Sequence, residues 1–165
     1  MARAASVALR ALTDLLRSRT GVTAQLAAIR TAAMLDRTEA PDPLVLALNA
    51  GVEAEDKATG SKYPQILVHL GKVRNLLTEK YRKFSGVVEL VVEVRVSHDR
   101  LDMLDRSTLV YTDSVVGVLE DCRGEWSDCA FYSGRYEIEY GPVKRGGRHF
   151  VQTTRISAPV EVSLG

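Results

Sequence analysis

Cysteine and histidine, the residue types typical of nucleophilic catalysis and zinc binding, are few in this chain. Two cysteines, Cys122 and Cys129, lie seven residues apart, and the histidines are His69, His98 and His149. A structural zinc site needs closely spaced pairs of Cys or His ligands, and the sequence has no C-x2-C pair. We therefore expect no metal site and interpret both cysteines as small core thiols, with a disulfide formed in an oxidising medium as the alternative.

Nucleophilic catalysis would require a cysteine beside a histidine that a third group orients. The sequence contains no nucleophile elbow, glycine-rich phosphate loop or zinc-protease helix. Glu137 and Glu139 would share one strand face, as glycosidase carboxylates can, but their alternation with tyrosines is typical of the charged face of a sheet. We expect no catalytic residue and no cofactor, and a hydrolase of unrecognised type that uses a cysteine is an open alternative. We predict that His69 is a satisfied core or interface histidine and that His98 is solvated.

Length and composition favour a single domain over residues 1–165. Hydrophobic residues make up 45% of the chain and charged residues 26%, which excludes the disordered, collagen-like and disulfide-stapled classes. No apolar run approaches the ~20 residues of a membrane span. Arg3, Arg10 and Asp14 interrupt the N-terminal segment before it reaches the ~7–15 apolar residues of a signal peptide. We therefore expect no membrane contact and a protein kept in the cytosol or in an assembly built there.

Periodicity predicts three helices, which cover residues 2–19, 23–34 and 107–121. Gly21 is expected to end the first helix and Thr23 to cap the second. Asp105 or Ser107 is expected to cap the third helix, which would end near Gly124.

Strict alternation of valine with charged residues predicts a long strand, with one buried face and one charged face. The predicted strands cover residues 44–48, 64–70, 86–98, 131–140 and 148–164. Residues 142–147 predict a hairpin turn, since Gly-Gly allows the positive φ angles that such turns need. This order favours an α+β fold: a mostly antiparallel sheet with the N-terminal and central helices packed on one face. Residues 49–62 are expected to form an exposed loop, and residues 72–83 a basic arm.

Charge is distributed unevenly, although 22 basic and 21 acidic residues leave a formal net charge of +1. Residues 57–83 carry seven basic side chains and one acid, whereas residues 89–139 carry twelve acids and five basic side chains. This grouping describes either ordinary solvated faces or separate surfaces that favour head-to-tail contact between identical subunits. The candidate interface residues are Lys72, Arg74, Lys80, Arg82, Glu89 and Glu93.

The order of elements resembles a known family. An amphipathic helix precedes the strand Val-Val-Glu-Leu-Val-Val-Glu-Val-Arg-Val, and a polar link leads to a helix ending near Leu119-Glu120-Asp121. A glycine-turned hairpin then finishes in Pro-Val-Glu-Val. This order is similar to the tail terminator and head–tail joining (neck) proteins of tailed bacteriophages and of phage-derived particles such as gene transfer agents. The resemblance covers about residues 1–20 and 64–165, whereas the segments 23–62 and 72–83 depart from it.

The resemblance implies a structural virion protein of the tail or neck, assembled in the host cytoplasm. It implies a homo-oligomeric, hexameric ring that ends tail-tube growth, with the tube protein below and a head-completion or connector protein above. Genomic DNA would pass through the channel without sequence-specific binding, since strong positive charge would hold phosphates and slow transit. A loop carrying Lys144, Arg145 and Arg148 would line the lumen or contact a partner.

Two alternatives stay open. Within the same particle, the chain could be a tail-tube subunit or a head-completion (stopper or adaptor) protein. Outside that class, it could be a nucleic-acid binding module that uses the basic arm, with Tyr81 and Phe84 as stacking residues.

Overall fold

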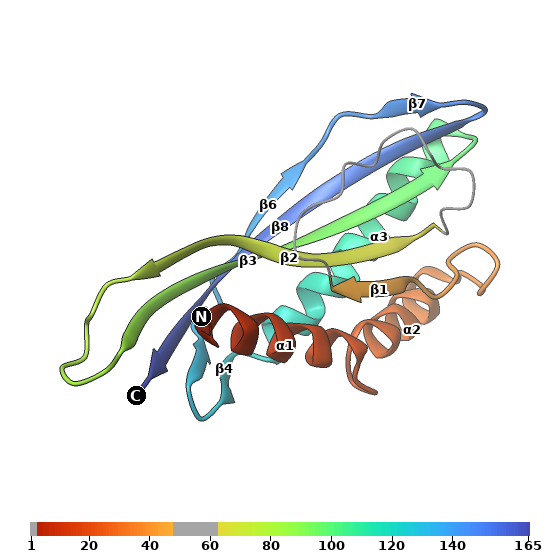
Figure 1. Cartoon of the computed structure of the whole chain (residues 1–165). Helices are drawn as coiled ribbons and strands as arrows, with labels where there is room; N and C mark the ends of the chain where they lie inside the picture. Colours follow the sequence, from red (N-terminus) through yellow and green to blue (C-terminus); the bar gives the residue numbers. More distant parts are fainter. Residues whose placement is uncertain (1–2, 48–62) are drawn as a thin grey trace.

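The computed structural model describes residues 3–47 and 63–165, and in this part of the chain three helices lie against an eight-stranded sheet (Figure 1). The helices are α1 (Arg3–Arg17), α2 (Val22–Ala33) and α3 (Leu101–Asp121). The strands are β1 (Leu44–Ala47), β2 (Gln65–Asn75), β3 (Phe84–His98), β4 (Gly124–Ser127), β5 (Ala130–Tyr132), β6 (Glu137–Tyr140), β7 (Lys144–Gly146) and β8 (His149–Leu164). The loop predicted over residues 49–62 lies outside the described residues.

The sheet is mostly antiparallel, as the sequence predicts. Its strand order is β1-β2-β3-β8-β5-β4, and β6 and β7 also pair with β8. The β1–β2 pair is parallel. The backbone of the sheet is the long ladder between β3 and β8, which runs from Phe84 opposite Leu164 to His98 opposite Phe150. The α+β fold class is therefore confirmed.

The hydrophobic core lies between one face of this ladder and the helices α1 and α3. Alternate residues of β3, from Val88 to Val96, are buried there, which confirms the predicted apolar face of the strand. Leu12 and Leu16 of α1 and Leu119 of α3 are fully covered against them. Helix α2 packs mainly against α3, on the outside of this layer. Within the described residues, no helix is long and apolar enough to cross a membrane.

The charged face predicted for β3 is more buried than the sequence indicates. Val91, Glu93 and Arg95 project away from the helices, yet they are 8%, 2% and 5% exposed. Alternation shows that two faces differ, but it does not show how much of the polar face neighbouring strands cover.

The helix boundaries differ from the prediction. Helix α1 ends at Arg17, and Gly21 is instead the residue before α2, where a Cβ would overlap the carbonyl oxygen of Leu16. Thr23 is not the cap, since α2 begins at Val22 without a side-chain cap hydrogen bond. Helix α3 begins at Leu101, six residues before the predicted start, because buried Leu104 extends its apolar side by one turn.

The predicted strand over 131–140 is two strands, β5 and β6, which pair with separate parts of β8. Gly134, between them, has a φ of 94°, a conformation that interrupts extended structure. A hairpin forms where predicted, but its turn is shorter than residues 142–147, because Lys144–Gly146 are strand β7. Gly146 lies opposite His149, and Gly147 in the turn has a φ of 66°.

Candidate assembly surface

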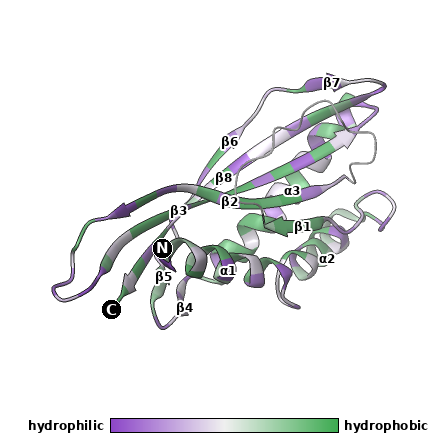
Figure 2. Ribbon diagram, viewed as in Figure 1, coloured by the Kyte–Doolittle hydropathy of each residue, from purple (hydrophilic) through white to green (hydrophobic). Residues whose placement is uncertain are grey.

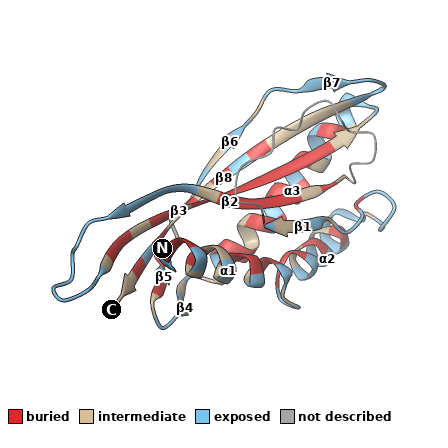
Figure 3. Cartoon of the chain, in the orientation of Figure 1, coloured by how far each residue is buried: buried red, intermediate tan, exposed pale blue. Residues whose placement is uncertain are grey.

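The segment predicted as a basic arm is the outer end of a β-hairpin. β2 continues to Asn75 and β3 begins at Phe84, so residues 72–75 belong to a strand and residues 76–83 form the turn. Every residue from 71 to 83 is exposed, whereas Ile66 to His69 of the same strand are buried (Figure 3). The hairpin therefore projects beyond the helices, and hydrophilic residues mark the outer part of β2 (Figure 2). We call residues 71–83 the hairpin arm.

The arm has a defined conformation, which hydrogen bonds within the hairpin and to β8 hold. The Asn75 side chain donates to the Lys83 carbonyl at 3.1 Å and accepts the backbone N–H of Ser85 at 3.1 Å. The hydroxyl of Ser163, on β8, donates to the Glu79 carboxylate at 2.9 Å. Gly86 allows the two strands to approach, since a Cβ there would overlap the carbonyl oxygen of Arg74.

Two residues of the arm hold left-handed backbone conformations. Leu77 has a φ of 50° and Tyr81 a φ of 68°, which costs a non-glycine residue on the order of 1 kcal/mol each. Both side chains nevertheless point into solvent, with Leu77 62% and Tyr81 99% exposed, and Leu76 beside them is 57% exposed. The turn thus holds a costly backbone shape and displays apolar side chains, a combination typical of a contact surface.

The structure brings the four predicted basic interface residues, Lys72, Arg74, Lys80 and Arg82, together on the arm. Arg82 lies 3.5 Å from Glu79 in an exposed ion pair. The other three make no ion pair within the described residues. Basic charge on the arm is therefore largely available to a partner, and the interface role of these residues stays a prediction.

The two predicted acidic interface residues have different surroundings. Glu89 is half-buried on β3, opposite Pro159. Glu93 is buried and its carboxylate accepts from Arg95 at 2.7 Å, from Arg155 at 3.0 Å and from His69 at 3.1 Å. Although burial raises the pKa of Glu93, the hydrogen bonds from Arg95 and Arg155 outweigh it and hold the pKa below its usual value.

This cluster gives Glu93 a role within the chain. His69 is satisfied and buried, as predicted. A partner would meet the cluster through Arg155, whose side chain is 55% exposed. Sequence reasoning missed Arg155 because its partner lies 62 positions away, and the pairing of β3 with β8 brings the two together.

The predicted lumen residues lie at the other end of the long ladder. Lys144, Arg145 and Arg148 are exposed around the β7–β8 turn, and the Arg145 guanidinium lies 5.9 Å from the centre of the Phe150 ring. The arm and this turn therefore occupy opposite ends of β8 (Figure 1).

The cysteines are placed apart from the histidines. Cys122 follows α3 and Cys129 lies in the β4–β5 turn beside Ser127, and both thiols are free. Neither thiol makes a hydrogen bond to a histidine in the described part of the chain. Burial, with a smaller contribution from Asp121, raises the pKa of Cys122 and so disfavours a reactive thiolate. Among the described residues, no group of three or more potential ligands could hold a metal ion.

The chain is similar to solved structures at low sequence identity. No protein-family model matches the chain, and no curated protein matches it. A chain described as "Virion of native gene transfer agent (GTA) particle" is 15% identical, with 98% of this chain and 99% of that chain covered, at a TM-score of 0.41. A similarity at this identity and TM-score does not show the role of this chain.

Proposed function

We propose that this chain is a structural subunit of a phage-type virion. In this proposal it assembles head to tail into a hexameric ring at the head-proximal end of a tail, where it ends growth of the tail tube. The ring joins the tube to a head-completion or connector protein and lets genomic DNA pass through its channel.

The hairpin arm is the observation that carries the proposal. Thirteen consecutive residues, 71–83, are exposed, ordered by their own hydrogen bonds, basic and partly apolar. Such an arm contributes little to the core of its own chain. Its exposed apolar side chains become stable when another molecule covers them.

A contact between the arm of one chain and a different surface of the next chain is head to tail. The arm lies at one end of the β3–β8 ladder and the turn with Lys144, Arg145 and Arg148 at the other, so an arm that binds a neighbour leaves this turn free. Contacts between unlike surfaces of identical chains are heterologous, and they close into rings when the rotation permits. A turn with three exposed basic residues could contact DNA in a channel without holding it tightly.

The direct test is the mass and shape of the purified protein, by light scattering and negative-stain electron microscopy. We expect closed rings of six subunits. Reversal of charge at Lys72, Arg74, Lys80 and Arg82 should abolish them without changing the circular dichroism spectrum. A matched reversal at Glu137 and Glu139, which are also exposed strand residues, should leave ring formation intact. Normal rings from the arm variant would contradict the proposal.

Electron microscopy of particles labelled at this protein would separate the related roles. A single ring at the junction of head and tail supports a terminator or neck protein, whereas labelling along the whole tail would identify a tube subunit.

A second candidate function is nucleic-acid binding, which one observation favours. Tyr81 is 99% exposed between Lys80 and Arg82, an arrangement suited to base stacking beside phosphate contacts. This candidate predicts at least micromolar affinity for single-stranded DNA that falls steeply with added salt, measured by fluorescence anisotropy. The ring proposal predicts an affinity weaker than micromolar at physiological salt.

A further inference from the structure

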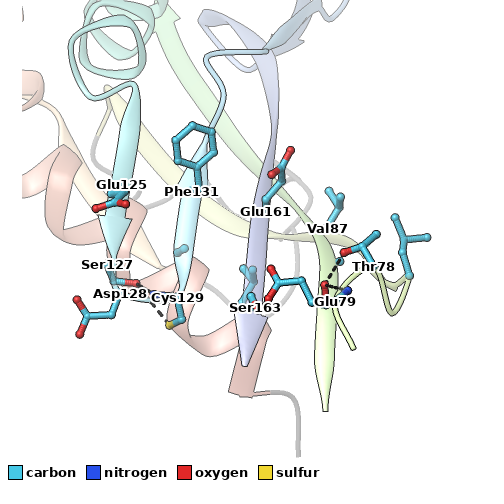
Figure 4. Close-up of a pocket in the computed structure, with 15 residues that line it drawn as sticks. Thr78, Glu79, Val87, Glu125, Ser127, Asp128, Cys129, Phe131, Glu161 and Ser163 are labelled. Atoms are coloured by element: carbon cyan, nitrogen blue, oxygen red, sulfur yellow. Dashed lines mark hydrogen bonds between the residues drawn. The ribbon is translucent and has the colours of Figure 1, made fainter. Parts of the chain in front are cut away.

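A groove of about 460 Å³ lies beside the base of the hairpin arm, on the sheet face away from the helices (Figure 4). The β4–β5 hairpin forms one wall, and β8 and the arm form the other. Among the fifteen residues that line it are four carboxylates and no Lys, Arg or His. This groove is acidic, whereas the arm beside it is basic.

Three of the lining side chains form a row across β4, β5 and β8. Phe131 of β5 pairs with Glu125 of β4 on one side and with Glu161 of β8 on the other. Directly paired residues of antiparallel strands share a face, so the phenyl ring lies between two glutamate side chains whose strands are about 10 Å apart. Phe131 is 44% exposed, and neither glutamate makes an ion pair within the described residues. We call these three residues the acidic row.

The end of the arm carries the complementary pattern. Lys80, Tyr81 and Arg82 follow one another as basic, aromatic and basic, and they are all exposed. We call these three residues the arm tip. The side chains of the acidic row follow the order acidic, aromatic, acidic, and the aromatic ring is also open to solvent.

We infer that the acidic groove of one subunit receives the arm tip of the next subunit in the ring. In this contact Tyr81 packs on Phe131, and the two basic side chains of the tip pair with Glu125 and Glu161. The inference rests on the ring proposed above and identifies the two surfaces that join neighbouring subunits.

Within one chain, the tip does not pair with the acidic row. Leu76, Thr78 and Glu79 of the arm already form part of the groove wall. The Lys83 N–H donates to the Leu164 carbonyl at 3.0 Å, and the Ser163 hydroxyl holds Glu79. These bonds fix the arm alongside β8, where Arg82 of the tip lies 3.5 Å from Glu79 and makes no ion pair with Glu125 or Glu161.

A second copy fits the groove better than a nucleic acid does. Asp128 adds a further exposed carboxylate to the acidic row, and a polyanion would be repelled from this surface. Each chain carries one tip and one groove, so every subunit of a closed ring has both surfaces occupied. The contact also covers Tyr81 and Phe131, two of the exposed aromatic side chains of the protomer.

Charge exchange between the two surfaces tests the inference. The tip variant carries Lys80→Glu and Arg82→Glu, and the groove variant carries Glu125→Lys and Glu161→Lys. Each variant alone should need at least tenfold higher concentration than the wild type to form rings. An equimolar mixture should restore rings, because the acidic tip then meets the basic groove and the basic tip meets the acidic groove in alternating subunits. Restoration requires an even number of subunits, which a hexamer provides.

The controls separate this inference from the proposed function. A variant with Glu137→Lys and Glu139→Lys makes the same acid-to-base change as the groove variant at two exposed residues outside the groove, and it should assemble as the wild type does. Wild-type rings together with no rescue in the mixture would overturn the inference and leave the ring proposal standing. Absence of wild-type rings would overturn the ring proposal. A tip variant that assembles normally but loses affinity for single-stranded DNA would overturn the inference in favour of nucleic-acid binding.

A cross-link provides independent evidence, since Cys129 lies in the groove. Lys80→Cys in a Cys122→Ser background places one new thiol beside an intact Tyr81. A short bismaleimide should then join subunits into covalent oligomers, seen as a ladder on denaturing gels. Cys129→Ser should remove the ladder. Rings that form without any cross-link would contradict the contact.

Discussion

The inner and outer halves of β2 belong to one strand but differ in what surrounds them. Ile66 and Val68 are fully buried beneath the helix layer, whereas residues 71–75 are exposed on both faces. The inner half stabilises the fold by burying apolar surface. The outer half continues the same hydrogen-bonded ladder with β3 but carries basic and apolar side chains into solvent. This difference indicates that stability and assembly depend on separate residues, which substitutions can test.

The largest effect is expected at Val92, in the inner part of the β3 ladder. It is fully buried, so Val92→Asp places an unpaired carboxylate in the core and should lower the free energy of unfolding by roughly 3–5 kcal/mol. Val73→Asp makes the same chemical change at a 45% exposed position of the arm and should cost less than about 1 kcal/mol. Urea denaturation followed by circular dichroism measures both. Equal losses would show that the arm and the inner part of the β2–β3 ladder, where Val92 lies opposite Val68, do not differ in their contribution to stability.

A smaller loss is expected at the buried ion-pair cluster. Glu93→Gln leaves Arg95 buried without its charged partner and should cost about 3 kcal/mol at pH 7. Because the pKa of Glu93 is lowered on folding, its stabilising contribution is present above the unfolded pKa of ~4.3 and is lost as the pH falls through the folded pKa. The difference between wild type and Glu93→Gln should therefore shrink as the pH falls below about 4. A constant difference from pH 7 to pH 3 would contradict this role.

Tyr81 should show opposite effects on stability and assembly. Tyr81→Gly removes the cost of a left-handed backbone, so it should be about 1 kcal/mol more stable than Tyr81→Ala, which keeps a β-carbon. Both variants lose the ring that we place on Phe131, and both should need a higher concentration to assemble. Thermal unfolding and light scattering measure the two properties. If either variant assembled as the wild type does, Tyr81 would not be part of the contact between subunits.

The smallest effect on stability is expected at Arg82. Its ion pair with Glu79 is exposed, so Arg82→Ala should change the free energy of unfolding by no more than about 0.5 kcal/mol. The same substitution should weaken ring formation measurably, because it removes one charge of the arm tip. A loss of stability without a loss of ring formation would show that Arg82 acts within its own chain and not in the contact between subunits.

The sequence is most informative where one strand face is apolar and the other is not. Alternation over β3 and β8 predicts both strands and their buried faces, because such a pattern buries one face only in an extended conformation. Alternation does not predict the outer half of β2, because both of its faces are exposed and Lys72 and Arg74 interrupt the apolar pattern. The sequence predicts too late a start for α3, because Asp102 and Asp105 flank Leu104 and interrupt the apolar spacing of the first turn.

The candidate surfaces depend on contacts that sequence order does not reveal. The basic arm residues were predictable as a group, since they lie close together in the chain. The acidic row was not, because Glu125 and Phe131 meet Glu161 through strand pairing across 30 or more positions. From the pattern of β3 alone, Glu93 is predicted to lie on the surface. Its partner Arg155 can be identified only once β8 is known to pair with β3.

Light scattering on the purified wild-type chain, across a hundredfold range of concentration, tests the central claim most directly. Head-to-tail closure predicts a discrete species six times the 18.1 kDa mass of one chain, in equilibrium with the single chain at low concentration. A mass of one chain at every concentration, with no species above it, would contradict the account.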